Sequence, residues 1–236
     1  MRQHGGAKLW RSEIRTFLTA LKEGCVFCYA RLVRIRIEGR EFWEKLHRKS
    51  CIVVANHVTG VDSVILQIAL RRRLFMLAAR RWFRNRFLAF VMTFFCDMVP
   101  VALEKGMKNL LGIKRTLALL RHRQSVGIYP SGEMYRNGLV PEIHNGAAYL
   151  AYKSGVPIVT VFVKNLALGP SRKKIEVGDD AVEGIGSFLK NIFNRKIEVF
   201  IAEPIYPRAD VDRFMEMERI NSEIRRSFDE LIANAT

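Results

Sequence analysis

The 236-residue sequence lacks an apolar run long enough to cross a bilayer. Its most apolar stretch, residues 87–103, is interrupted by Asp97 and Pro100, whereas a spanning helix needs about 20 mostly apolar residues. We expect no secretory signal peptide either, because residues 1–8 are polar and the apolar pattern after them carries several charges. The sequence therefore predicts a protein that does not span a membrane.

Cysteine is also scarce, with four residues in the chain. Cys25 and Cys28 have the spacing of a zinc or redox pair, but no second pair of cysteines or histidines follows at zinc-finger spacing. Both lie on the apolar stripe of a helical pattern, where we expect them to pack as small hydrophobic residues. The cysteines indicate no metal site, no disulfide framework and no need for an oxidising compartment.

Acidic residues are few relative to basic ones: 23 Asp and Glu against 39 Lys and Arg give a formal charge of +16. The sequence is 49% hydrophobic, which excludes a charged disordered chain. The charge alone fits nucleic acid, anionic lipid or a phosphate-bearing metabolite. We expect no nucleic-acid partner, because the basic residues are dispersed and no helix-turn-helix, RRM or zinc motif is present.

Residues 9–32 have the pattern of an amphipathic helix with a basic polar face. Apolar residues recur at helical spacing from Trp10 through Leu21 to Leu32, with arginines and lysines between them. Such a helix either lies in the headgroup layer of a bilayer or covers the core of its own domain, and the pattern leaves both open. We expect residues 1–33 to form an N-terminal membrane-associating helix and residues 34–236 to form one further domain.

Short apolar segments alternate with helical ones through the rest of the chain. The patterns predict strands at 34–38, 51–55, 98–103, 125–129, 156–163, 173–177 and 196–202, and helices at 61–70, 107–121, 142–154 and 210–233. This alternation indicates a single layered α/β domain with a mostly parallel central sheet flanked by helices.

One strand-to-helix junction carries the residues best suited to catalysis. The predicted strand at 51–55 leads into Asn56 and His57, and Asp62 lies in the first turn of the next helix. Sites are usually built at this edge of an α/β sheet. Imidazole takes up a proton near neutral pH, and a carboxylate on its second nitrogen fixes the tautomer. The same pair also fits a first-turn acid beside an ordinary turn histidine.

The segment Asn-His-x4-Asp-Ser at 56–63 resembles the first sequence block of the glycerolipid O-acyltransferases, which include the 1-acylglycerol-3-phosphate acyltransferases. Later segments resemble further family blocks in the family order, at 98–101, 128–133, 145–159 and 199–205. The resemblance covers about residues 34–234.

The resemblance implies transfer of a fatty acyl group from a thioester, acyl-CoA or acyl carrier protein, to the hydroxyl of 1-acylglycerol-3-phosphate or a related lysolipid in phospholipid biosynthesis or remodelling. His57 would be the general base and Asp62 would orient it, with no nucleophilic side chain, no metal and no cofactor besides the thioester co-substrate. The implied partners are the lysolipid, the acyl donor and an anionic membrane surface. The implied location is peripheral or monotopic, on the cytoplasmic face of a membrane.

Two segments depart from the family pattern where the family handles its phosphate-bearing acceptor. Ser131 stands in place of the usual glutamate, and residues 102–103 replace the usual arginine, with Lys105 as a shifted cation. We therefore predict retained acyl transfer with an altered acceptor; the alternative is a catalytically altered domain that serves as a lipid-binding module. The predicted substrate-binding residues are Asn56, Lys105, Ser131, Gly132, Glu133 and Arg136.

Residues 71–73 and 80–86 combine arginines with Trp82 and Phe83 ahead of the apolar run. This mixture is typical of a membrane interface, where rings lie in the headgroup layer and cations meet lipid phosphate. A solvated basic helix packed by its apolar side is the alternative.

Overall fold

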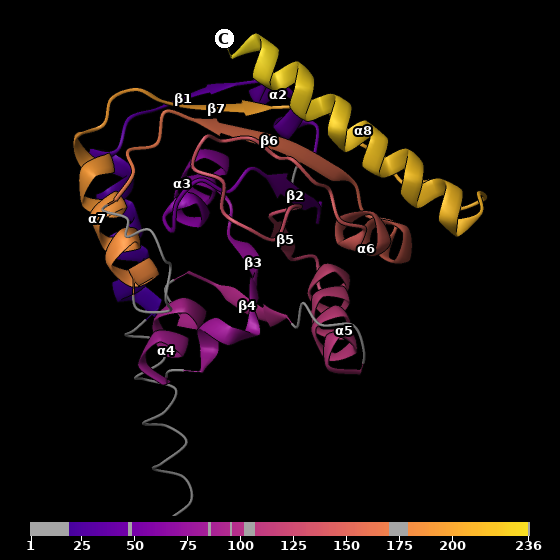
Figure 1. Ribbon diagram of the computed structural model, residues 1–236, viewed down its shortest axis with the longest axis horizontal. Coiled ribbons are helices and arrows are strands. Elements are labelled where there is room, and N and C mark those ends of the chain that lie inside the picture. The colour runs from indigo at the N-terminus through magenta and orange to yellow at the C-terminus, as the bar shows by residue number, and fades with distance from the viewer. Residues whose placement is uncertain are drawn as a thin grey trace, which may run out of the picture.

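The computed structural model describes residues 19–46, 49–84, 86–94, 96–101, 107–169 and 179–235. Within these ranges one sheet of seven strands has the order β1-β7-β6-β2-β5-β3-β4 (Figure 1). The strands are β1 (Ile35–Glu38), β2 (Ile52–Ala55), β3 (Leu74–Ala79), β4 (Met98–Val101), β5 (Ser125–Ile128), β6 (Ile158–Lys164) and β7 (Ile197–Ile201).

A helical segment at residues 19–32 precedes the sheet. The other helices are α2 (Arg40–Glu44), α3 (Asp62–Leu70), α4 (Arg86–Phe94), α5 (Met107–Arg121), α6 (Gly146–Ser154), α7 (Asp179–Phe193) and α8 (Arg213–Asn234), with a short 3-10 helix at Arg80–Phe83. None of the helices in the described ranges is long and apolar enough to cross a membrane.

Five neighbouring strands, β6, β2, β5, β3 and β4, run parallel. At the other side β7 pairs antiparallel with β6, and β1 pairs parallel with β7. The sheet is therefore mixed but mostly parallel, and the predicted α/β class is confirmed. Because parallel strands end at the same edge, the loops that follow β2 and β5 lie together.

Two hydrophobic layers enclose the sheet. Side chains alternate along β2, so Val53 and Ala55 join a layer with α3 and the segment at 19–32, whereas Ile52 and Val54 join a layer with α6 and α8. In Figure 1 α3 and α7 lie on one side of the sheet and α5, α6 and α8 on the other. The junction that carries Asn56 and His57 is thus anchored by a strand that is buried on both faces.

Most predicted elements occur within a few residues of their expected bounds. Two helices begin later than predicted: α6 at Gly146 and α8 at Arg213. The side chain of Asp212 caps α8 by accepting hydrogen bonds from the N–H groups of Phe214 and Met215, which fixes its start. The structure adds β3, which lies between β4 and β5, and also α7; neither was assigned from the sequence. The predicted strand at 173–177 lies outside the described residues.

The N-terminal helical segment has an orientation that corrects one expectation. Within the predicted apolar stripe Tyr29 is buried, whereas Leu21, Cys25, Cys28 and Leu32 are exposed. The expectation that Cys25 and Cys28 pack as hydrophobic residues is wrong, because this part of the stripe faces away from the core. The part of the predicted helix before residue 19 lies outside the described residues.

Candidate active site

The turn between β2 and α3 is tied down first by Asn56. Its side-chain amide donates to the carbonyl of Val163 at 2.9 Å, and its oxygen accepts from the N–H of Val163 at 2.8 Å. These two hydrogen bonds attach the end of β2 to β6, and both polar atoms of the Asn56 side chain have backbone partners. Asn56 was predicted to bind substrate; the structure places it almost fully buried below the site, in a position to hold the turn.

Asp62 begins α3, and its carboxylate organises the turn. One oxygen accepts from the N–H of Val58 at 2.6 Å, and both accept from the N–H of Thr59 at 3.0 and 3.1 Å. The hydroxyl of Thr59 in turn accepts from the N–H of Val61 at 2.9 Å. Asp62 is 0% exposed. A buried carboxylate held by several donors has a fixed position, which is what an orienting group requires.

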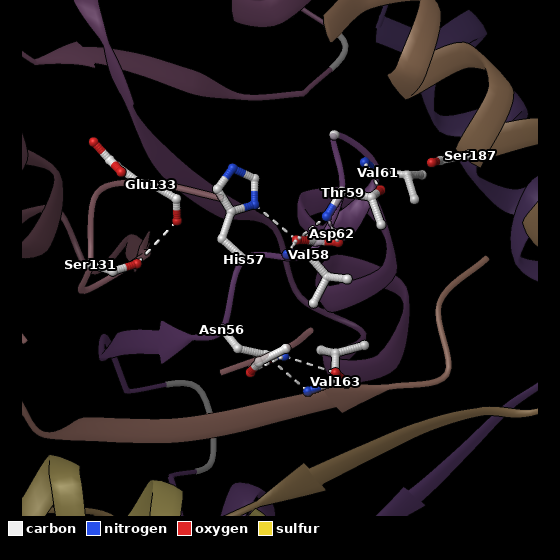
Figure 2. A network of polar contacts seen from close by, with 12 residues as sticks. Asn56, His57, Val58, Thr59, Val61, Asp62, Ser131, Glu133, Val163 and Ser187 are labelled. Carbon is white, nitrogen blue, oxygen red and sulfur yellow. Dashed lines mark hydrogen bonds and ion pairs between the residues drawn. The ribbon is translucent and has the colours of Figure 1, made fainter. Parts of the chain in front are cut away.

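His57 lies directly against this carboxylate. Its Nδ1 is 2.9 Å from Oδ2 of Asp62, and the side chain keeps 21% of its surface exposed. Figure 2 shows the second ring nitrogen, Nε2, pointing away from Asp62. With the proton on Nδ1 donated to the carboxylate, Nε2 carries a lone pair on the side of the ring away from Asp62. The structure therefore brings together the two predicted catalytic residues in the geometry of a general base and its orienting acid.

Tyr129, which directly follows β5, supports the ring of His57. The two rings stack with centroids 4.0 Å apart and an interplanar angle of 6°. The hydroxyl oxygen of Tyr129 is buried and has no hydrogen-bond partner among the described residues. Burial, and then the nearby Asp62 and Cys96, raise the pKa of Tyr129 well above its usual range, so the hydroxyl stays neutral. The sequence analysis missed this role; the only signal was its place beside Pro130 in the third segment.

The loop after β5 brings the altered third segment against the catalytic turn. The N–H of Tyr135 donates to the carbonyl of His57 at 2.7 Å. Gly132 has a φ of 68°, which favours glycine, and its N–H closes a turn onto the carbonyl of Tyr129. The hydroxyl of Ser131 donates to the carbonyl of Glu133 at 3.0 Å (Figure 2).

The predicted substrate-binding residues of this loop differ in exposure. Ser131 is buried, Arg136 is half-buried, and Gly132 and Glu133 are exposed. The loop therefore presents the exposed carboxylate of Glu133, and Ser131 shapes the backbone. Lys105, predicted as the shifted cation, lies outside the described residues.

Glu183 of α7 is a second residue that the sequence analysis missed. Its carboxylate is buried and accepts from the N–H of Gly60 at 3.0 Å, the N–H of Gly169 at 3.3 Å and the hydroxyl of Ser187 at 2.7 Å. A Cβ on Gly60 would lie 3.2 Å from the Cα of Gly184, so the turn and α7 are in close contact. Glu183 is 123 residues from Gly60, and no local pattern pairs them.

Two of the arginines expected at a membrane interface have partners within the protein. Arg72 donates to the carbonyl of Lys49 at 2.9 Å and lies over the ring of Trp43. Arg73 forms an ion pair of 2.5 Å with Asp97, which Lys22 also contacts. These contacts hold the start of β3 and attach the N-terminal helical segment to the domain. Over the described ranges, no three His, Cys, Asp or Glu side chains gather in a way that could hold a metal ion.

The fold agrees with the comparisons with known proteins. A family model described as Acyltransferase matches residues 34–164, more than half of the chain, and the chain belongs to this family. Among solved structures, it is similar to the crystal structure of the 1-acyl-sn-glycerophosphate (LPA) acyltransferase, PlsC, from Thermotoga maritima. The identity is 15% and the TM-score is 0.59, over 99% of this chain and 84% of that chain. The resemblance stated from the sequence is therefore confirmed at the level of family and fold.

Proposed function

We propose that this acyltransferase is membrane-associated and transfers a fatty acyl group from an acyl thioester to the hydroxyl of 1-acylglycerol-3-phosphate or a related lysolipid. The observation that carries the proposal is the pairing of His57 with the buried Asp62, with Nε2 open at the carboxyl edge of the sheet. Family membership supports the reaction class. The likeness to the Thermotoga maritima enzyme supports the fold on which this pair is carried.

The geometry supports direct transfer. Nε2 of His57 takes the proton from the acceptor hydroxyl as the oxygen attacks the thioester carbonyl. Asp62 stabilises the imidazolium that forms, and Tyr129 keeps the ring plane in place. The tetrahedral intermediate then expels the thiolate, which takes the proton back from His57. One ester bond forms, one thioester bond breaks, and the side chains end as they began.

A single substitution tests the assignment of the base. His57→Ala removes the proton acceptor, so we expect acyl transfer to fall about a thousandfold. Asp62→Asn should cost about a hundredfold or more, because the imidazolium loses its charged partner. His122→Ala, at an exposed histidine after α5, is the matched control. The assay is release of free thiol from acyl-CoA or acyl carrier protein, with circular dichroism to verify folding. Full activity of His57→Ala would exclude this mechanism.

The acceptor is tested separately, on wild-type protein. Because the segments that the family uses for the phosphate-bearing acceptor are altered here, we propose that, of these acceptors, a related lysolipid is preferred over lysophosphatidate. A panel of lysophosphatidate and lysolipids with larger headgroups, each with the same thioester, measures the preference. Lysophosphatidate as clearly the best acceptor would contradict the altered-acceptor proposal. Vesicle binding without activity on any acceptor would favour the lipid-binding module.

A further inference from the structure

Helix α7 has its polar and apolar faces reversed relative to an ordinary surface helix. The residues it buries are polar: Glu183, Ser187 and Asn191, spaced four apart, are 3%, 0% and 0% exposed. They hydrogen-bond to backbone rather than packing on apolar side chains. The amide of Asn191, for example, exchanges two bonds of 2.9 Å with the backbone of Ala167. A helix that covers a core in water is expected to bury its apolar face instead.

The outward face of α7 is correspondingly apolar. Ile185, Leu189 and Phe193 are also spaced four apart and are 64%, 55% and 84% exposed. Each of them lies two positions after one of the buried polar residues. At about 100° of rotation per residue, this offset places them on the opposite side of the helix. Isolated exposed apolar residues are common, but an aligned row on one helix face indicates a contact surface.

The N-terminal helical segment continues this surface. Figure 1 shows it beside α7, and the ring of Tyr29 stacks on that of Phe188 with centroids 3.9 Å apart. The Tyr29 hydroxyl also donates to the carbonyl of Phe188 at 3.1 Å. The two helices are joined at this contact, and the segment also exposes apolar side chains, which include Leu21, Phe27 and Leu32 at 47%, 62% and 55%.

Exposed cations flank these apolar side chains. Arg31 lies over the ring of Phe27 at 5.3 Å, and Arg195 and Lys196 follow the end of α7. Glu23 is an exposed acid on the same N-terminal segment, and among the side chains of these two helices that the structure describes, the exposed cations outnumber the exposed acids. Apolar rings bordered by arginine and lysine match a bilayer surface that has acyl chains beneath anionic headgroups.

We infer that α7 and the helical segment at residues 19–32 form one docking face for an anionic lipid surface. The inference rests on the proposed function, because a lysolipid acceptor resides in a membrane. It extends the contact beyond the N-terminal helix to α7. Since the buried face of α7 holds Gly60 through Glu183, the helix that rests on lipid is also the one that holds the catalytic turn.

The test compares two matched pairs of exposed apolar residues. Leu189→Gln with Phe193→Gln alters the docking face; Phe214→Gln with Met215→Gln alters the start of α8, where the side chains are 73% and 67% exposed. Figure 1 places these two regions on opposite sides of the molecule. Binding is measured by flotation with vesicles of phosphatidylcholine and phosphatidylglycerol in a roughly 3:1 ratio, in low salt and in about 0.5 M salt.

We expect the α7 pair to weaken vesicle binding about tenfold or more and to leave binding weak at high salt, because apolar insertion is lost. The α8 pair should bind like the wild type. Equal binding by both variants, or no binding by the wild type, overturns the inference. Loss of a dimer in the α7 variant by sedimentation, with vesicle binding intact, would assign the face to a protein partner instead. Vesicle binding by a wild-type protein that transfers no acyl group would leave the inference standing and reject the proposed function.

Discussion

Helices α7 and α8 share a periodicity and have opposite chemistry. Both are long and each covers one face of the sheet, yet α8 buries Ile220, Ile224 and Phe228 at 0% exposure, whereas α7 buries a row of polar residues. Burial of apolar side chains stabilises the fold in water, so α8 is secured by the hydrophobic effect. Helix α7 contacts the core through the partly buried Ile192, and Tyr29 through Phe188, but its fully buried side chains form hydrogen bonds to loop backbone, which contribute less net stability and fix positions. The comparison indicates that one helix maintains the fold and the other positions the site.

The largest loss of stability is expected from a substitution in the buried face of α8. Phe228→Ala leaves a cavity in a layer that also contains Ile158 and Phe162, so the free energy of unfolding should fall by about 3–5 kcal/mol. Urea denaturation followed by circular dichroism measures the change. A loss below about 1 kcal/mol would mean that the α8 layer adjusts easily, and the contrast with α7 would disappear.

A smaller loss of stability, with a separate effect on catalysis, is expected at Glu183 of α7. Glu183→Leu removes the acceptor of the Gly60 N–H and of the Ser187 hydroxyl, which should cost about 2–3 kcal/mol, whereas the Gly169 N–H keeps the hydroxyl of Ser187 at 2.6 Å. The freed turn should also lower kcat about tenfold with little change in KM, because His57 is positioned less well. Steady-state kinetics and urea denaturation separate the two effects. Glu183→Gln should recover part of the lost stability and part of the lost kcat. Lost stability with an unchanged kcat would show that α7 supports the fold and not the site.

The parts of the fold and of the candidate site that depend on local sequence patterns could be predicted from the sequence. The strand at 51–55, the turn and the first residue of the next helix are contiguous, so the pairing of His57 with Asp62 follows from a short motif. The parallel sheet follows from the alternation of strands and helices. The closing helix was predicted because its apolar side faces the core, as the hydrophobic effect requires in water.

The features that the sequence did not predict are of two kinds: the orientation of a helix relative to the core, and contacts between residues far apart in the sequence. Periodicity locates the apolar stripe of the segment at 19–32 but does not say which of its side chains face the core: Tyr29 is buried, whereas Leu21 and Leu32 face outward. Helix α7 reverses the usual rule, and its contact with Gly60 spans 123 residues. Tyr129 meets His57 only because β5 and β2 are parallel neighbours, which the sequence did not specify.

The buried carboxylates of α8 and α7 have different partners, and the stability that the α8 carboxylate contributes should depend on pH. Glu216 is bonded by Arg219 at 2.5 and 2.9 Å and by the N–H of Arg208 at 2.8 Å. Among the residues that the structure describes, the donors to Glu183 are neutral: the N–H groups of Gly60 and Gly169 and the hydroxyl of Ser187. The hydrogen bonds from Arg219 lower the pKa of Glu216 below its ordinary value. Glu216→Gln should therefore cost about 1–2 kcal/mol at neutral pH.

Because the folded pKa is the lower one, this contribution is present above about pH 4.5 and is lost as the pH falls through the folded value. Urea denaturation of both proteins at neutral pH and in steps below that value should show the difference shrinking. A difference that persists at the lowest pH would place the effect of Glu216 in packing and not in charge.

The smallest change in the free energy of unfolding is expected on the outward face of α7. This change distinguishes α7 most clearly from α8. Ile185→Ser replaces a side chain that is already 64% exposed, so in water the free energy of unfolding should change by no more than about 0.5 kcal/mol. Thermal and urea denaturation without lipid measure it. A loss near that of Phe228→Ala would show that Ile185 packs against the protein and that α7 is an ordinary covering helix. A negligible change means that this apolar row contributes nothing in water, so any advantage of keeping it apolar must arise in contact with something other than water.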